Sequence, residues 1–207
     1  MIVTRKKSAR IRPKTGLTGE QSIRTFIALS IAEPLADLLA SHADYIRADD
    51  RSREIRWVPP ENYHLTVEFL GQVDAAMIRP LGDELANSVA DFVLPAQCVE
   101  EVSYFPFVAR PRVVAALLRR NEPLLELHKR VCKAVRAAGL ALQRRRFHPH
   151  ITLGRVRGRR APRLLIPPVM LGVAAEFSML TVYESRLSPE GASYLPLFET
   201  ELSLGIP

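Results

Sequence analysis

His64-Leu65-Thr66-Val67 recurs later in the chain as His150-Ile151-Thr152-Leu153, with the same type of residue at all four positions. Polar and apolar residues alternate in both copies, as they do in a strand that buries one face. Each copy follows a proline-containing turn and a stretch that is expected to contain a helix. The repeat therefore predicts two related lobes, each of which contributes one such strand.

The rest of the chain predicts an α+β fold with largely antiparallel sheets. Apolar runs and alternating patterns predict strands at residues 24–29, 54–58, 64–70, 97–105, 112–118, 151–156, 173–184 and 194–201, and helical spacing predicts helices at residues 31–48, 74–89 and 121–138. This order lacks the regular strand–helix alternation of a doubly wound parallel fold. We expect two pseudo-symmetric lobes of mostly antiparallel sheet, with helices on the outside.

Length and composition indicate one domain. The chain has 207 residues and 47% hydrophobic content, which is enough for one sizeable core. We expect residues 23–207 to form a single bilobal domain and the basic, aperiodic residues 1–22 to form a disordered tail. The chain contains no apolar run of the ~18–20 residues that a membrane helix needs. Its two cysteines, Cys98 and Cys132, show no metal-type spacing. These features predict a monomeric cytoplasmic protein with free thiols.

Positive charge is concentrated in two segments. The formal net charge is +7, and residues 1–22 alone contribute +5. Residues 144–163 contain no acidic residue and eight arginines, at positions 144, 145, 146, 155, 157, 159, 160 and 163. A basic segment of this kind attracts polyanions such as nucleic acid. Because this segment surrounds the second motif, we expect it to favour a phosphorylated or RNA substrate.

The two motifs carry the residues that phosphodiester hydrolysis requires. Within each strand the histidine and the threonine share a face, so two adjacent strands would surround one space with His64, Thr66, His150 and Thr152. Histidine has an ordinary pKa of ~6.5 and can accept or donate a proton near neutral pH, while threonine hydroxyls can bind phosphate oxygens. General acid–base catalysis contributes ~10²–10⁴-fold per group, which suffices for a strained cyclic phosphate. The residues alone leave open which histidine is the acid.

The sequence resembles the two-histidine phosphoesterases, and among them the RNA 2′,3′-cyclic phosphodiesterases, historically called 2′-5′ RNA ligases. The resemblance is carried by RWVPPENYHLTVEFLG at residues 56–71 and FHPHITLGR at residues 147–155, with further matches at residues 24–29, 105–107, 111–112, 183–185, 191 and 194. Val67, Tyr63 and the basic tail depart from the usual pattern. The resemblance implies a metal-free and cofactor-free cleft, in which His64 donates a proton to the leaving 3′ oxygen and His150 activates water. The product would be a 2′-phosphomonoester of RNA.

Other interpretations of the same chain stay open. An RNA ligase that runs the reaction in reverse, or a non-catalytic nucleotide-binding module, would use the same cleft. His148 with His150 and His64 would make a three-histidine metal site, although Pro149 places His148 in a turn before the strand.

Side chains around the motifs are expected to lie outside the group that contacts the reacting phosphate. Strict alternation puts Arg155 and Arg157 on the face opposite His150, as surface residues or distal RNA contacts, and it puts Phe69 in the core. The aromatic residues Trp57, Tyr63 and Phe147 are interpreted as packing residues, with stacking on a nucleobase as the alternative. The helical histidines His42 and His128 are interpreted as structural or solvated.

Overall fold

The computed structural model describes residues 9–11, 22–106, 109–143, 145–158, 162–189 and 191–204. Its strands are β1 (Ala9–Ile11), β2 (Ser22–Ser30), β3 (Ile55–Trp57), β4 (His64–Asp74), β5 (Val93–Leu94), β6 (Gln97–Phe105), β7 (Val113–Leu118), β8 (His150–Val156), β9 (Val169–Ala175), β10 (Met179–Leu187), β11 (Ala192–Glu201) and β12 (Ser203–Leu204). The helices are α1 (Glu33–Asp49), α2 (Ile78–Ser88) and α3 (Glu122–Ala137), with 3-10 turns at Pro60–Asn62 and Ala75–Met77.

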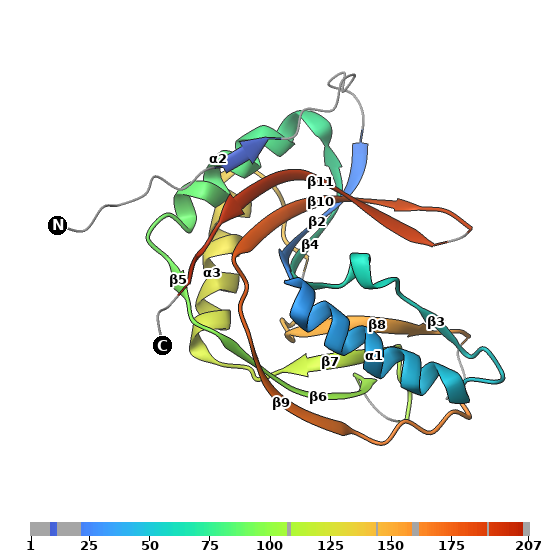
Figure 1. Ribbon diagram of the computed structural model, residues 1–207. Coiled ribbons are helices and arrows are strands. Elements are labelled where there is room, and N and C mark those ends of the chain that lie inside the picture. Colours follow the sequence, from blue (N-terminus) through green and yellow to red (C-terminus); the bar gives the residue numbers. More distant parts are fainter. Residues whose placement is uncertain are drawn as a thin grey trace.

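One curved sheet runs through the molecule (Figure 1). Its strand order is β1-β11-β10-β2-β4-β8-β7-β6-β9, with β3 paired to the side of β8. Every pairing in this sheet is antiparallel, and only the separate β5–β12 pair within the described residues is parallel. The α+β prediction with mostly antiparallel sheet is confirmed.

The strand order is symmetric about the junction between the two motif strands. β2, β10 and β11 continue the sheet on the β4 side, and β7, β6 and β9 continue it on the β8 side. At the junction Leu65 of β4 pairs with Ile151 of β8, and both side chains are fully buried. The two lobes predicted from the repeated motif are therefore the two halves of one sheet, and they meet where the motifs lie.

The helices pack on the two halves separately. α2 and α3 contact each other and cover the half that contains β4 and β11, whereas α1 lies against β3 and β8 (Figure 1). α3 begins after Asn121, whose side-chain oxygen accepts a hydrogen bond from the backbone N–H of Leu124, as expected for an N-cap. Buried apolar side chains from both halves form one continuous core.

Some local expectations need correction. Ser30 and Glu33 have the spacing of a capping box, which predicts a helix start at Ser30; instead Ser30 ends strand β2, and the N-cap of α1 is Ala32. The single strand expected at residues 173–184 is two strands, β9 and β10, which lie in opposite halves of the sheet. Of the basic tail, Ala9–Ile11 forms strand β1 on the edge of β11; residues 1–8 and 12–21 lie outside the described residues. No described helix is long and apolar enough to cross a membrane.

Gly82 tests the packing of α2 against β11. Alanine is normally favoured over glycine in a helix interior by about 1 kcal/mol. A Cβ at position 82, however, would lie 2.3 Å from the ring of Phe198, which is only 1% exposed and has no room to move. We therefore expect Gly82→Ala to lower the free energy of unfolding by about 1–3 kcal/mol, measured by urea denaturation. The exposed neighbour Asp83→Ala should change it by less than about 0.5 kcal/mol. A stabilised Gly82→Ala variant would contradict this packing.

Candidate active site

The two motifs lie next to each other on strands β4 and β8. The strands are antiparallel and paired at Leu65–Ile151, so the histidine of each motif lies across from the threonine of the other. Alternate residues of a strand project from one face, and the four polar side chains, His64, Thr66, His150 and Thr152, are all half-buried on the face that the apolar motif residues avoid. Diagonal neighbours across a strand pair are about 7–8 Å apart. This spacing accommodates one phosphate group between the two imidazoles.

Each imidazole is held in the same way. Nδ1 of His64 lies 2.8 Å from the carbonyl oxygen of Asn62, and Nδ1 of His150 lies 2.8 Å from the carbonyl oxygen of His148. A carbonyl oxygen only accepts hydrogen bonds, so Nδ1 of each ring carries the proton and donates it. Nε2 is then left without a proton in the neutral ring. Each histidine therefore has one nitrogen fixed by the backbone and one available for proton transfer.

Aromatic rings surround both histidines. The His64 ring lies 4.9 Å from Phe26 and 5.0 Å from Tyr194, measured between ring centroids. The His150 ring stacks on Phe105 with a centroid separation of 4.7 Å. These contacts restrict ring rotation and remove water from one side of each imidazole. These three aromatic residues come from strands outside the motifs, and the only signal for them in the sequence was the family resemblance at residues 24–29, 105–107 and 194.

A β-bulge follows the threonine in both motifs. Thr66 pairs with Ala28 and Glu68 with Ile27, so that Val67 is an extra residue in β4. In β8, Thr152 pairs with Ala115 and Gly154 with Val114, which makes Leu153 the extra residue. Both bulges occupy the fourth position of the motif. An extra residue reverses the alternation of the side chains that follow it.

The bulge in β8 corrects the predicted orientation of Arg155. Strict alternation placed Arg155 opposite His150, but beyond the extra residue Leu153 it turns to the side of the histidines. Its positive charge lowers the pKa of both His64 and His150. Gly154 was the available signal, since glycine inside a strand often marks a bulge.

The bulges of β4 likewise bring Phe69 out of the core. Phe69 is 38% exposed, its ring centroid lies 6.1 Å from that of Phe26, and the guanidinium of Arg145 lies 5.7 Å from its ring centre. The prediction that Phe69 is a core residue was wrong, because it assumed an unbroken alternation along β4.

The other flanking residues lie mostly where they were expected. Tyr63 is buried at 5% exposure, and Phe147 stacks on His128 with a centroid separation of 4.6 Å. His148 precedes β8 and is exposed, so it lies in the turn rather than on the strand. Nδ1 of His42 on α1 lies 2.8 Å from the carbonyl oxygen of Leu38, so it donates a hydrogen bond within its own helix.

Burial and positive charge keep both imidazoles neutral. The pKa of His64 is lowered to about 4, chiefly by burial and in smaller part by the charges of Arg155 and His150, against the opposing effect of the hydrogen bond to Asn62. Burial also lowers the pKa of His150, with Arg155 and His148 adding to the effect. The effect of a charged His150 on the pKa of His64 requires the two rings to be close to each other. Two neutral imidazoles beside a cation form a site that favours an anionic ligand.

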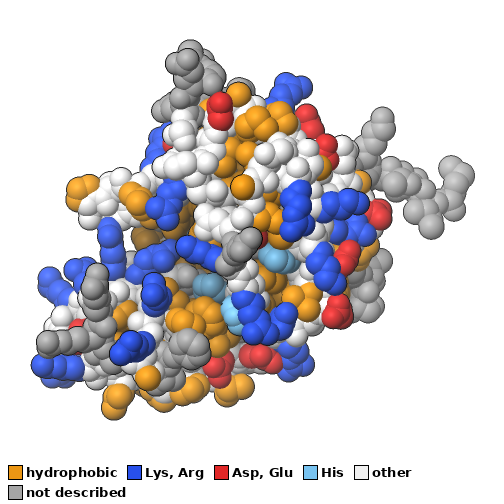
Figure 2. All heavy atoms as spheres, turned by 180° about the vertical axis from the view of Figure 1, so that it is seen from behind, with side chains coloured by type: hydrophobic (Ala, Val, Ile, Leu, Met, Phe, Trp, Pro, Cys, Tyr) orange, Lys and Arg blue, Asp and Glu red, His pale blue; other side chains and the backbone are white. Residues whose placement is uncertain are grey.

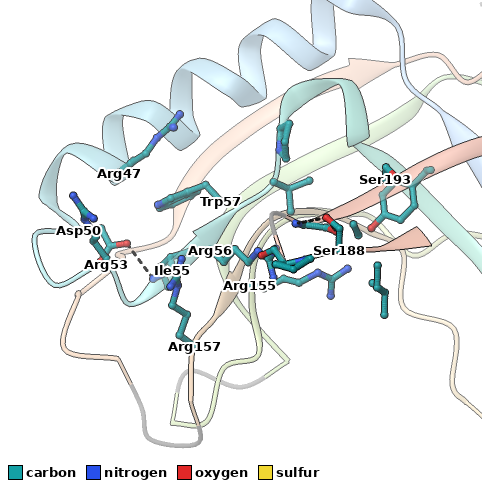
Figure 3. A pocket seen from close by; sticks show the side chains of 17 residues that line it. Arg47, Asp50, Arg53, Ile55, Arg56, Trp57, Arg155, Arg157, Ser188 and Ser193 are labelled. Carbon is teal, nitrogen blue, oxygen red and sulfur yellow. Dashed lines mark hydrogen bonds between the residues drawn. The ribbon is translucent and has the colours of Figure 1, made fainter. Parts of the chain in front are cut away.

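A cavity of about 1100 Å³ lies next to the motif strands, although none of the four motif side chains is among its described lining residues. Those residues include Tyr194, which contacts His64, as well as Trp57 and five arginines, Arg47, Arg53, Arg56, Arg155 and Arg157. Figure 3 shows Arg56, Arg155 and Arg157 along one side of it, on and just after the paired strands β3 and β8. Asp50, the one carboxylate among the lining residues that the structure describes, accepts hydrogen bonds from two backbone N–H groups. In Figure 2, Lys and Arg side chains surround histidine side chains near the middle of the face.

The sequence and the structure are similar to known proteins over most of the chain. The family model described as LigT like phosphoesterase matches residues 29–115 and 118–194. A Thermotoga maritima protein named RNA 2′,3′-cyclic phosphodiesterase is 27% identical over 190 residues, covering 89% of this chain and 98% of its own length. A Thermus thermophilus protein of the same name is 31% identical over 189 residues, covering 84% of this chain and 88% of its own length.

Solved structures share the fold. A crystal structure of a Thermus thermophilus protein has a TM-score of 0.71 and 28% identity, covering 87% of this chain and 98% of its own. The crystal structure of Escherichia coli LigT complexed with 3′-AMP has a TM-score of 0.67 over 88% of this chain and 99% of its own, at 23% identity. At 23% identity, the similarity to Escherichia coli LigT shows a shared fold and no more.

The effect of Arg155 on both histidines is measurable in the free protein. We expect the His64 imidazole to titrate near pH 4 and the His150 imidazole below 6.5, followed by NMR of the ring resonances. Arg155→Gln should raise both pKa values, because it removes a cation that disfavours the protonated rings. Arg157→Gln, two residues further along the chain, should leave them nearly unchanged. A His64 pKa of 6.5 or above, or one insensitive to Arg155→Gln, would contradict the site described above.

Proposed function

This chain belongs to the LigT-like phosphoesterase family, and from that premise we propose that it hydrolyses 2′,3′-cyclic phosphodiester ends of RNA to 2′-phosphomonoesters. Residues 23–207 act as one bilobal catalytic domain in this proposal, with the cleft at the β4–β8 junction. The observation that carries it is the pair of imidazoles across one strand pair, each with Nδ1 bound to a carbonyl and Nε2 available.

In the proposed reaction His150 is the base and His64 is the acid. The oxygen of a water molecule bonds to phosphorus while Nε2 of His150 takes its proton. The bond between phosphorus and the 3′ oxygen breaks, and Nε2 of His64 donates its proton to that oxygen. The hydroxyls of Thr66 and Thr152 donate hydrogen bonds to the non-bridging phosphate oxygens.

Arg155 has two opposed effects in this scheme. Its cation stabilises the negative charge that develops on the phosphate oxygens. In the free protein the same cation helps keep His64 neutral, although the acid must start the reaction protonated. The bound phosphodiester carries a negative charge that raises the pKa of both rings. Substrate binding thus favours the protonated form of His64, and proton uptake is linked to binding.

The arginine-lined cavity supports a polymeric RNA substrate. A cyclic mononucleotide has a single phosphate, which the four motif side chains and Arg155 already bind in this proposal. Arg47, Arg53 and Arg56 extend the positive charge away from the histidines. Phosphates of the preceding nucleotides would fit along this path, since arginine binds phosphate with several parallel hydrogen bonds. Trp57 lines the same cavity and is half-buried. Its indole Nε1 is buried and has no hydrogen-bond partner among the described residues.

Two alternatives use the same geometry. A ligase would employ the same two histidines on a cyclic phosphate end, with an RNA 5′ hydroxyl in place of water. A non-catalytic binding module would need neither ring to exchange a proton. The pairing of two available Nε2 atoms favours catalysis over binding alone.

The catalytic assignment is tested by replacing the histidines one at a time. We expect His64→Ala and His150→Ala each to lower kcat on an oligonucleotide with a 2′,3′-cyclic end by about 10²–10⁴-fold, because each removes one proton-transfer group. His42→Ala, a helical histidine distant in sequence from both motifs, serves as the matched control and should keep its rate. Chromatography against synthetic standards should identify a 2′-phosphate. Two single variants with near wild-type rates, or a 3′-phosphate product, would contradict the assignment.

The path of the RNA is tested by comparing two substrates. Arg56→Ala and Arg157→Ala should lower kcat/KM for a cyclic-ended oligonucleotide and leave kcat/KM for a 2′,3′-cyclic mononucleotide nearly unchanged. For the oligonucleotide, the slope of log KM against log salt should fall by about 0.7 for each phosphate contact that is lost. Arg79→Ala on the exposed surface of α2 is the control for net charge. Equal losses on both substrates would contradict an extended path.

A further inference from the structure

Three potential metal ligands meet on the core side of strand β4. Nε2 of His128 lies 3.2 Å from Oε2 of Glu68. Sγ of Cys132 lies 3.6 Å from the same oxygen and 3.5 Å from Nε2 of His128. The Glu68 side chain is 7% exposed and the His128 side chain 21%, and Cys132 is 8% exposed. A carboxylate, an imidazole and a thiol are therefore clustered and largely removed from water.

These separations are close to the edges of a tetrahedron around zinc. With Zn–N and Zn–O distances of about 2.0–2.2 Å and Zn–S of about 2.3 Å, tetrahedral angles place N and O about 3.3–3.4 Å apart. They place sulfur about 3.5–3.6 Å from either atom. The three measured separations, 3.2, 3.5 and 3.6 Å, agree with these edges to within about 0.2 Å. The three atoms are therefore spaced as ligands of one zinc ion would be.

Local structure explains how the three groups come together. His128 and Cys132 are four residues apart on α3, so they lie on the same face of the helix. Glu68 follows the extra residue Val67 of β4, and the bulge leaves its side chain on the buried side, facing that helix. The His128 ring is held by parallel stacking on Phe147, with an interplanar angle of 2°.

A small cavity lies beside two of the three groups. It has a volume of about 70 Å³, which is room for at least one water molecule, and Glu68 and His128 line it whereas Cys132 does not. Its lining also includes two arginines and residues of or next to the two motifs, namely Arg145, Arg146, Thr66, Phe69, Phe147 and His148. The cluster therefore adjoins the proposed active site, while the catalytic histidines His64 and His150 do not line this cavity.

We propose that Glu68, His128 and Cys132 bind one zinc-class divalent cation that connects helix α3 to strand β4. The donor set contains one nitrogen, one oxygen and one sulfur, which suits zinc and its close chemical relatives better than the hard cations Mg²⁺ and Ca²⁺. A carboxylate and a thiolate neutralise both charges of the ion, which matters at a buried site.

A hydrogen-bonded triad without metal is the competing interpretation. In that case the Glu68 carboxylate accepts hydrogen bonds from Nε2 of His128 and from the Cys132 thiol. The 3.2 Å separation of Nε2 and Oε2 lies at the long end of the range for N–H···O hydrogen bonds and fits both arrangements. Metal titration separates the two.

The test is metal binding by the untagged full-length chain after treatment with a chelator. Titration with Zn²⁺ in competition with a chromophoric chelator should show one equivalent bound. Co²⁺ should give the absorption of a tetrahedral ion together with a thiolate-to-cobalt charge-transfer band. Cys132→Ser, His128→Gln and Glu68→Gln should each weaken Zn²⁺ binding by more than about 100-fold, beyond the usual loss from an outer-shell partner. Wild-type protein should also gain thermal stability on Zn²⁺ addition, because the ion binds the folded state.

Matched variants separate this site from other zinc ligands. Cys98→Ser removes the other cysteine, and a His64→Ala/His150→Ala double variant removes the catalytic pair; both should bind Zn²⁺ like the wild type. Circular dichroism confirms the fold of each variant, and the Co²⁺ spectrum of the wild type needs no variant. Less than stoichiometric binding, a Co²⁺ spectrum without the thiolate band, or Zn²⁺ binding lost only in the double variant would overturn the proposal. None of these measurements depends on phosphodiesterase activity.

Discussion

The pairing of Leu65 with Ile151 is the interaction on which the site depends. It joins the two halves of the sheet, and it sets which residues of β4 and β8 lie opposite each other. Both side chains are fully buried, so the apolar face of each motif holds this register. A slip of one residue would turn the whole set of side chains to the other face, taking the histidines and threonines out of the cleft and exposing the apolar residues to water.

The bulge after each threonine is the second constraint. The residue two positions after the extra residue lies on the same side of the sheet as the motif histidine. Phe69 and Arg155 therefore lie on the cleft side, whereas an unbroken alternation would place them on the opposite face. The same irregularity leaves Glu68 facing α3. One extra residue in each strand thus serves both the cleft and the core behind it. The equal position of the bulges in both motifs also extends the internal symmetry beyond the four residues that repeat in the sequence.

The sequence predicted what depends on local pattern. Periodicity indicated the motif strands and the shared face of His64 and Thr66, Asn121 indicated the start of α3, and the repetition indicated two lobes. The helix expected from residue 74 begins only at Ile78, after a 3-10 turn. Prediction failed where a distant strand decides the outcome. A bulge depends on the register with β2 or β7, and the rings of Phe26, Phe105 and Tyr194 reach the histidines only through the sheet order. Ser30 has the spacing of a capping residue, yet pairing with His64 of β4 extends the strand through it. Its hydroxyl lies 3.0 Å from the hydroxyl of Tyr183 on β10 rather than at the start of α1.

The identical attachment of the two imidazoles has a consequence for the direction of the chemistry. Both rings donate from Nδ1 to a backbone carbonyl two residues earlier and expose the same nitrogen, so either ring has the hydrogen-bonding equipment of an acid or of a base. By microscopic reversibility, the pair that opens a cyclic phosphate with water also closes the ring again, and an alcohol that occupies the water position is activated by the same nitrogen. Hydrolysis and strand joining then differ in which nucleophile is present at sufficient concentration, and the same catalytic groups accelerate both.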